Sequence, residues 1–249
     1  MYDLFFLPVR LASRSHAPPV SDRSLPPGQR RVDGFPRFGT HLHHPPPAIP
    51  ADPAIEIRGA VTEPFSVPLA RLATLQRRRQ TADFHCVAGW SATGLRWEGV
   101  PFATFYREII EPVLAPGQVV THLGFGGLDD YRSFVTIEDA LADDVLIAEH
   151  LEDRPLDSDH GAPARQVSPS QYGFISTKHL CLVEVRSAPP SKTFGRTPLI
   201  QAHARARVWE EERHPYFPAW SLRHVYRLLI PPFMFLSARG SREDVDDDT

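Results

Sequence analysis

The chain has 249 residues, 42% of them hydrophobic and 23% charged, with a formal net charge of -3. This length and apolar content suffice for one large domain or two small ones, and the charge gives no reason to expect nucleic acid as a partner. Proline is in excess, at 26 residues, which disfavours a helical bundle and favours a β-rich chain with many loops and edge strands.

Two cysteines, Cys86 and Cys181, are too few for a secreted disulfide scaffold. Cys181 lies in the strand-like run H-L-C-L-V-E-V, where we expect it to fill core space, and a Cys86–Cys181 disulfide is the lesser alternative. No segment has the ~18 apolar residues of a membrane span. The first apolar stretch has an early acidic residue, an internal proline and no twin-arginine pair before it. It resembles no export signal, and we expect a cytoplasmic protein.

Residues 1–26 are irregular and polar beyond that stretch, so we expect an arm that packs on the body or frays. Residues 26–40, P-P-G-Q-R-R-V-D-G-F-P-R-F-G-T, predict a turn-rich loop that several arginines make basic. It is either a solvated loop or a wall over an anionic group, because a planar guanidinium suits phosphate oxygens. H-L-H-H at residues 41–44 precedes three prolines, and we expect solvated histidines there rather than a zinc site.

Cys86 follows the apolar, β-prone end of a predicted strand, in D-F-H-C-V-A-G-W-S. Gly89 permits a sharp departure after the thiol, so a strand holds the cysteine and a loop presents it. Such a thiol is a nucleophile, half of a disulfide, a soft metal ligand or a small buried hydrophobe. Upstream, residues 55–61 alternate like a half-buried strand, and the arginines at 77–79 are interpreted as a solvated run.

Downstream, residues 100–114 repeat apolar side chains at helical spacing and predict an amphipathic helix. Residues 119–136 predict a strand, a glycine loop at 124–127 and a second strand, and the loop would let backbone approach a ligand at Gly124. Residues 218–230 predict a helix with Leu222, Val225 and Leu229 on one face. It docks on the body or on a twin subunit, or it rests on a membrane surface.

Three further motifs accompany the cysteine segment: F-P-R-F-G-T at residues 35–40, H-G-A-P-A-R at 160–165 and Y-G-F-I-S-T-K at 172–178. Together, in this order and spacing, they resemble the sulfite oxidase-fold molybdopterin-dependent oxidoreductases. The similarity is to the stand-alone bacterial sulfite oxidase-like proteins and the catalytic subunits of protein-methionine-sulfoxide reductases. The resemblance covers about residues 27–187.

The resemblance implies an α+β fold, mostly β with mixed sheets, of the sulfite oxidase type that binds molybdopterin. The helical pattern at residues 218–230 adds a C-terminal helical extension to it. The expected boundaries are 1–26 for the arm, 27–190 for the molybdopterin-binding oxidoreductase domain, 191–240 for the extension and 241–249 for an acidic, disordered tail. The implied cofactor is Mo-molybdopterin, with Cys86 as metal ligand and catalytic residue. The implied cofactor-binding residues are Asp33, Pro36, Arg37, His85, Gly124, His160, Arg165, Ser176, Thr177 and Lys178.

The residues after Cys86 limit the substrate. Sulfite oxidases continue with A-G-N-R-R, whose cations suit an oxyanion, whereas this chain has V-A-G-W-S. The resemblance therefore favours oxo transfer on a neutral acceptor such as a sulfoxide, with Trp90 shaping the pocket. No haem motif is present, so electrons come from a separate partner. Two alternatives stay open: a cysteine-dependent hydrolase using Cys86 with His85 or His160, and a non-catalytic pterin-binding module of the same fold.

Overall fold

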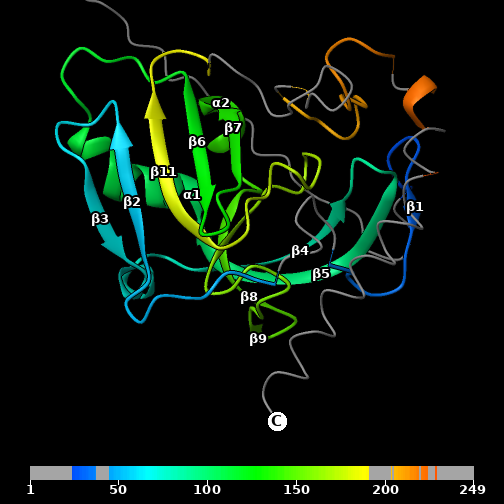
Figure 1. Ribbon diagram of the computed structural model, residues 1–249, viewed down its shortest axis with the longest axis horizontal. Helices are drawn as coiled ribbons and strands as arrows, with labels where there is room; N and C mark the ends of the chain where they lie inside the picture. Colours follow the sequence, from blue (N-terminus) through cyan, green and yellow to red (C-terminus); the bar gives the residue numbers. More distant parts are fainter. Residues whose placement is uncertain are drawn as a thin grey trace, which may run out of the picture.

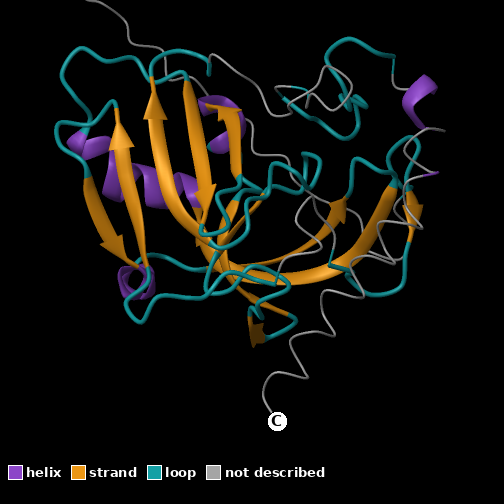
Figure 2. Cartoon of the chain, in the orientation of Figure 1, coloured by secondary structure: helices purple, strands orange, loops and turns teal. Residues whose placement is uncertain are grey.

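The computed structural model describes residues 24–37, 45–190, 203, 205–218, 220–223 and 228. Strands and loops dominate these residues, and the helices are short (Figure 2). The predicted α+β class, mostly β with mixed sheets, is confirmed. The histidines at residues 41–44 and most of the predicted C-terminal helix lie outside the described residues.

The first sheet carries the Cys86 segment. Its strands are β1 (Arg30–Arg31), β4 (Arg78–His85), β5 (Trp90–Pro101), β8 (Leu146–Leu151), β9 (Arg154–Pro155) and β10 (Arg165–Val167). The long β5 is central: it pairs antiparallel with β4 and β8, and parallel with β1. β4 and β5 curve together toward β1, so the Cys86 turn lies beside the N-terminal segment (Figure 1).

The second sheet has the strand order β3-β2-β11-β6-β7. Its strands are β2 (Ala54–Gly59), β3 (Phe65–Pro68), β6 (His122–Gly127), β7 (Arg132–Thr136) and β11 (Leu180–Arg186). β2 and β11 are parallel and the other neighbours antiparallel, which makes the sheet mixed. The helices are α1 (Phe102–Phe105), continued by a π turn (Tyr106–Ile110) and a 3-10 turn (Glu111–Val113), a 3-10 helix (Leu69–Thr74) and α2 (Ile137–Ala140).

Two apolar clusters hold these layers together. The larger packs on the second sheet, where alternating residues such as Ile55 and Ile57 are fully buried. The smaller lies under the first sheet and contains Cys86 with Trp90 and Trp97, both 1% exposed. Each such side chain stabilises the fold by about 1.5–3 kcal/mol on burial. The cysteine segment is therefore anchored on a packed core.

Three predictions need correction. Residues 100–101 complete β5, so the predicted helix begins only at Phe102. The glycines at 124–127 lie inside β6, because the turn falls at residues 128–131 instead. The arginine run at 77–79 is not simply solvated: Arg77 contacts Glu149 and Glu98, and Arg79 pairs with Glu98 at 2.6 Å. Carboxylates on neighbouring strands, which the local pattern does not show, explain this last difference.

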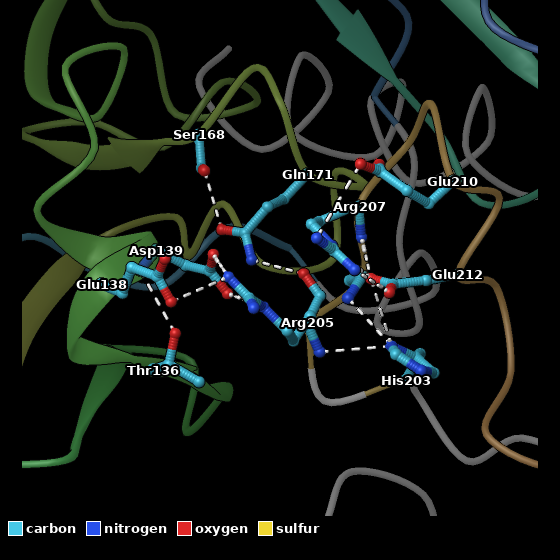
Figure 3. Close-up of polar contacts among 11 residues, drawn as sticks. Thr136, Glu138, Asp139, Ser168, Gln171, His203, Arg205, Arg207, Glu210 and Glu212 are labelled. Carbon is cyan, nitrogen blue, oxygen red and sulfur yellow. Dashed lines mark hydrogen bonds and ion pairs between the residues drawn. The ribbon is translucent and has the colours of Figure 1, made fainter.

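The C-terminal segment at residues 205–218 contacts the rest of the chain without forming a helix or a strand. Figure 3 shows Arg205 aimed at α2, where it donates to both carboxylate oxygens of Asp139, while Gln171 Nε2 donates to the Arg205 carbonyl at 2.5 Å. Ala206 and Val208 are fully buried in the larger cluster. This irregular segment therefore makes core contacts that the sequence pattern assigns to a docked helix.

The predicted helical extension is not confirmed. Backbone at residues 220–223 and at Leu228 is helical, but Val225 and Leu229 lie outside the described residues. Leu222 is half-buried, whereas Trp220 is 69% exposed. No helix in the described ranges has the length and apolar content needed to cross a membrane.

Candidate cofactor site

Cys86 lies on a tight turn between β4 and β5. Its N–H donates to the Trp90 carbonyl at 2.8 Å, and the Gly89 N–H donates to the Cys86 carbonyl at 2.9 Å. Gly89 has φ of +105°, a conformation that side chains disfavour, so the predicted corner is confirmed. The Ala88 N–H points at Cys86 Sγ, 3.5 Å away. The turn thus presents the thiol at the end of a strand and gives its sulfur a backbone donor.

The thiol of Cys86 is neutral in this environment. Burial raises its pKa to about 12, although the Ala88 N–H and the charge of Arg213 act in the opposite direction. Both cysteines are free, which excludes the Cys86–Cys181 disulfide in this structure. A thiol this protonated is a poor nucleophile by itself, whereas a bound metal ion displaces the proton and takes the thiolate. The environment therefore suits a metal ligand better than an unassisted nucleophile.

Arg165 is a fully buried cation surrounded by carbonyls and rings. It donates to the carbonyls of His160 at 2.9 Å and Ser176 at 3.0 Å. Its guanidinium carbon lies 5.4–5.9 Å from the ring centres of Phe35, Phe84 and Trp97. Burial lowers its pKa to about 9. The arginine therefore holds the 160–165 motif against the 172–178 motif by hydrogen bonds that a lysine cannot reproduce.

Lys178 completes a group of cations. Its Nζ donates to the Asp159 carbonyl at 2.5 Å, and Arg37 Nε pairs with the Asp159 carboxylate at 3.4 Å. Burial, with the charges of Arg165 and Arg37, lowers the pKa of Lys178 to about 7, while Asp159 and Asp129 oppose this. Three cations from three chain segments thus lie close enough to influence one another, and such a group suits a phosphate. We call Arg37, Arg165 and Lys178 the cationic cluster.

Backbone pairing brings two of these cations together. The Leu180 N–H donates to the Ala164 carbonyl at 2.8 Å, and the His179 N–H donates to the Gly161 carbonyl at 3.2 Å. Gly161 has φ of +103°, and a Cβ there would lie 3.1 Å from the Lys178 Cα. Glycine in H-G-A-P-A-R is therefore needed both for its conformation and for the close approach of Lys178.

The other predicted residues of these motifs face the protein. Both His160 ring nitrogens have partners: Nδ1 lies 2.7 Å from Asp157 Oδ1, and Nε2 lies 2.8 Å from the Phe35 carbonyl. Ser176 Oγ accepts from the Ser168 N–H at 3.1 Å, and Thr177 Oγ1 lies 2.8 Å from Ser133 Oγ. These side chains hold the walls of the site together, and their contacts with a cofactor stay predictions.

The remaining predicted residues are spread more widely. Asp33 is exposed, and Pro36 is half-buried beside Arg37. His85 is buried, and its Nδ1 lies 2.7 Å from Ser91 Oγ, while burial lowers its pKa to about 4. A Cβ at Gly124 would lie 2.8 Å from the Phe134 ring, so a neighbouring side chain occupies the space predicted for a ligand.

Sequence reasoning missed three residues near the thiol. Gln29 Nε2 donates to the Cys86 carbonyl at 3.0 Å, and Arg213, 1% exposed, donates to the Val87 carbonyl. Tyr131 donates to the Phe174 carbonyl at 2.5 Å, and burial raises the pKa of its hydroxyl, with further contributions from Asp129 and then Cys86. No local motif marks them, because each reaches the site through tertiary contacts.

The donor set fits a metal carried by a phosphorylated organic cofactor. No group of three or more His, Cys, Asp or Glu side chains within the described ranges would hold a metal ion by itself. A single thiol with a separate cationic cluster instead suits a metal that brings its other ligands on an anionic cofactor. This defines the class of site: a cofactor-dependent metal centre with one protein thiolate.

The comparisons agree with that class. The family described as oxidoreductase molybdopterin binding domain matches residues 42–194, more than half of the chain, so the chain belongs to this family. It is therefore an oxidoreductase with Mo-molybdopterin as its cofactor, which confirms the predicted family, enzyme class and cofactor.

Individual relatives are more distant. The chain is 28% identical over 174 residues to the protein-methionine-sulfoxide reductase catalytic subunit MsrP of Xanthomonas campestris, covering 62% of this chain and 52% of the relative. It is 27% identical over 159 residues to the uncharacterized oxidoreductase YuiH of Bacillus subtilis, covering 64% and 76%. A solved structure, the sulfane dehydrogenase SoxCD of Paracoccus pantotrophus, matches with a TM-score of 0.49 at 20% identity, covering 81% of this chain and 56% of that one. The chain spans about half the length of the reductase subunits that it matches.

Proposed function

We propose that the chain reduces a sulfoxide by oxo transfer on Mo-molybdopterin, with Cys86 as the protein ligand of the metal. The observation that carries this is the combination of one buried thiol on a tight turn with a separate cationic cluster from three segments. Cys86 would supply the thiolate, and Arg37, Arg165 and Lys178 would hold the phosphate end of the cofactor. When bound, the cofactor supplies the two-electron redox chemistry.

The charges beside Cys86 support a neutral substrate. Burial raises the pKa of the Cys86 thiol, and the positive charge of Arg213 opposes that rise. The Nη2 of Arg213 donates to the Pro27 carbonyl at 3.2 Å, and its Nε lies 3.7 Å from Glu211. Its ring partner Tyr172 lies 5.0 Å away. The Glu211 carboxylate offsets the charge of Arg213, so this guanidinium attracts an oxyanion such as sulfite less than an arginine without a carboxylate beside it. The relative MsrP is named a protein-methionine-sulfoxide reductase, which agrees with this substrate class.

Trp90 does not have the place predicted for it. It is 1% exposed and packs with Phe35 and Phe84 inside the smaller cluster, with ring centres 6.4 and 6.1 Å away. It therefore packs in the core beside the Cys86 turn and does not line an open pocket.

The reaction needs an external source of electrons. A sulfoxide takes up two electrons and two protons and yields a sulfide and water, and we propose that a separate electron-transfer protein donates the electrons. Cytoplasmic location and contact of residues 218–230 with a membrane surface stay predictions.

The hydrolase alternative requires a hydrogen bond between Cys86 Sγ and the imidazole of His85 or His160. Among the described residues, the hydrogen bonds of His85 go to Ser91, and those of His160 go to Asp157 and Phe35. Neither imidazole is hydrogen-bonded to Cys86 Sγ, whose N–H donor is Ala88. A general base that activates a thiol needs hydrogen-bond reach to it.

The test is turnover of protein produced in a host that makes the cofactor. With a reduced dye as electron donor, we expect reduction of methionine sulfoxide and simple dialkyl sulfoxides, and little oxidation of sulfite. Protein that contains molybdopterin and turns over none of these would support the non-catalytic binding module. Faster sulfite oxidation than sulfoxide reduction would contradict the neutral-substrate argument.

A further inference from the structure

Gln29 links the N-terminal segment to the carbonyl of Cys86. It precedes β1, whose Arg30 pairs with Trp90 of β5, and this pairing sets Gln29 beside the turn. Its side chain is 9% exposed. The amide uses both ends: Nε2 donates to the Cys86 carbonyl at 3.0 Å, and Oε1 accepts from Ser91 Oγ at 3.0 Å. A buried amide with both ends satisfied is fixed in one orientation.

Ser91 and His85 extend this contact into a chain of hydrogen bonds. The Ser91 hydroxyl has one proton, which it donates to Gln29, so its oxygen accepts from His85 Nδ1 at 2.7 Å. Ser91 and His85 are both buried, at 0% and 6% exposure. These hydrogen bonds run from His85, the last residue of β4, through Ser91 and Gln29 to the Cys86 carbonyl. They therefore enclose the residue that presents the thiol.

A second contact holds the next carbonyl of the turn. Arg213 donates to Val87 and to Pro27, so it joins the turn to the segment that carries Gln29. Gly28 makes this possible, because a Cβ there would lie 2.9 Å from Arg213 Nη2 and 3.0 Å from Arg223 Nε. The two successive carbonyls of Cys86 and Val87 are thus held by segments from opposite ends of the chain.

We propose that Gln29 is a positioning residue for Cys86, which fixes the orientation of the thiol through the carbonyl of the same residue. The part of this proposal that concerns the metal rests on the proposed function. Without the amide, the Cys86 carbonyl loses one of its two donors and the Ser91 hydroxyl loses its acceptor. Groups that hold a metal ligand in place tune its orientation as well as its stability.

The experiment compares Gln29→Leu with the matched control Gln80→Leu. Gln80 also donates from Nε2 to a backbone carbonyl, that of Asp144 at 2.8 Å, but it lies on β4 away from the turn. In cofactor-free protein, iodoacetamide labelling at fixed pH is followed at Cys86, with Cys181 as internal reference. We expect the labelling rate of Cys86, relative to that of Cys181, to be about fivefold higher in Gln29→Leu than in the wild type. In the Gln80→Leu control this relative rate should equal that of the wild type. In loaded protein, we expect shifted Mo(V) electron paramagnetic resonance g-values in Gln29→Leu alone.

Unchanged labelling and an unchanged Mo(V) spectrum in soluble Gln29→Leu would overturn the proposal, even if its melting temperature falls. If Gln29→Leu is insoluble, Ser91→Ala takes its place, since it removes the hydroxyl donor from Gln29 Oε1 with a small change in volume. Faster Cys86 labelling in Ser91→Ala supports the proposal, and wild-type labelling opposes it. The labelling needs no metal, so it decides the role of Gln29 even if the proposed reaction proves wrong.

Discussion

Arg213 donates a hydrogen bond to the carbonyl of Val87, the residue that follows Cys86. The two residues are 126 positions apart, and the contact makes the C-terminal segment part of the turn that presents the thiol. The same segment buries Ala206 and Val208 in the larger cluster. Core packing and the candidate site therefore share one structural element.

Deleting residues 206–249 is expected to destabilise the protein and loosen the Cys86 turn. The deletion exposes the surface under Val208 and removes Arg213, for a combined loss of about 3 kcal/mol or more. Thermal unfolding should shift down by on the order of 10 °C, with lower solubility. Deletion of residues 241–249, the predicted acidic tail, is the control and should change neither. A 206–249 deletion as soluble and thermostable as the full chain would contradict this account.

Gly161→Ala is expected to cost more stability than Gly117→Ala. Both glycines have positive φ, +103° and +76°, so both substitutions carry about 1 kcal/mol of backbone strain. An added methyl group would meet Lys178 at Gly161, whereas nothing lies within 4 Å of one at Gly117. We expect an extra ~1–3 kcal/mol for Gly161→Ala in chemical denaturation, together with reduced cofactor content. Equal losses at the two positions would show that Lys178 does not pack closely against this glycine.

Lys178 is expected to make the cofactor-free protein more stable as pH rises from about 7 toward 10. Its folded-state pKa is lowered to about 7, below the 10.5 of the unfolded chain, so the unfolded state binds more protons in this window. Below pH 7 both states carry the proton, and the folded state bears the full cost of the buried charge, on the order of a few kcal/mol. Lys178→Met should flatten the rise measured by denaturation at pH 6 and pH 9. The same slope in both proteins would exclude Lys178 as its source.

Arg165→Lys is expected to lose cofactor almost as fully as Arg165→Ala. Lysine keeps the charge but cannot donate to His160 and Ser176 together or stack between the aromatic rings. Leaving buried carbonyls unpaired costs about 1–3 kcal/mol each. Molybdopterin content per chain is the measurement, and Arg96→Lys, at an exposed ion pair, is the control. Wild-type cofactor content in Arg165→Lys would show that charge alone is sufficient.

The amino-acid sequence predicted those features of the fold that depend on residues close together in the chain. The turn after β4 followed from Gly89, whose positive φ the structure confirms. The family resemblance assigned both the 160–165 and the 172–178 motif to the cofactor, and the structure brings Arg165 and Lys178 into one cluster. These features need only short-range pattern or a known motif order.

What sequence missed depends on tertiary contact. Gly124 looked like a loop residue, but pairing with β7 and β11 makes it part of a strand. Gln29 and Arg213 were not singled out, because nothing local shows that both reach the carbonyls of one turn. Trp90 looked like a pocket wall, and packing with Phe84 buries it instead. The partners of Gly124 on β11, of Gln29 and of Arg213 are distant in sequence, so no local pattern marks these contacts.

X-ray absorption at the molybdenum edge counts the sulfur neighbours of the metal and so shows whether Cys86 ligates it. A thiolate is a soft, strong donor, whereas serine keeps its proton near neutral pH and cannot replace it. Cys86→Ser should retain much of the pterin, because the cationic cluster is intact. Its spectrum should show one sulfur neighbour fewer than that of the wild type, with turnover abolished. The same sulfur count in Cys86→Ser and wild type, or no molybdenum in wild-type protein from a cofactor-competent host, would show that Cys86 does not ligate molybdenum.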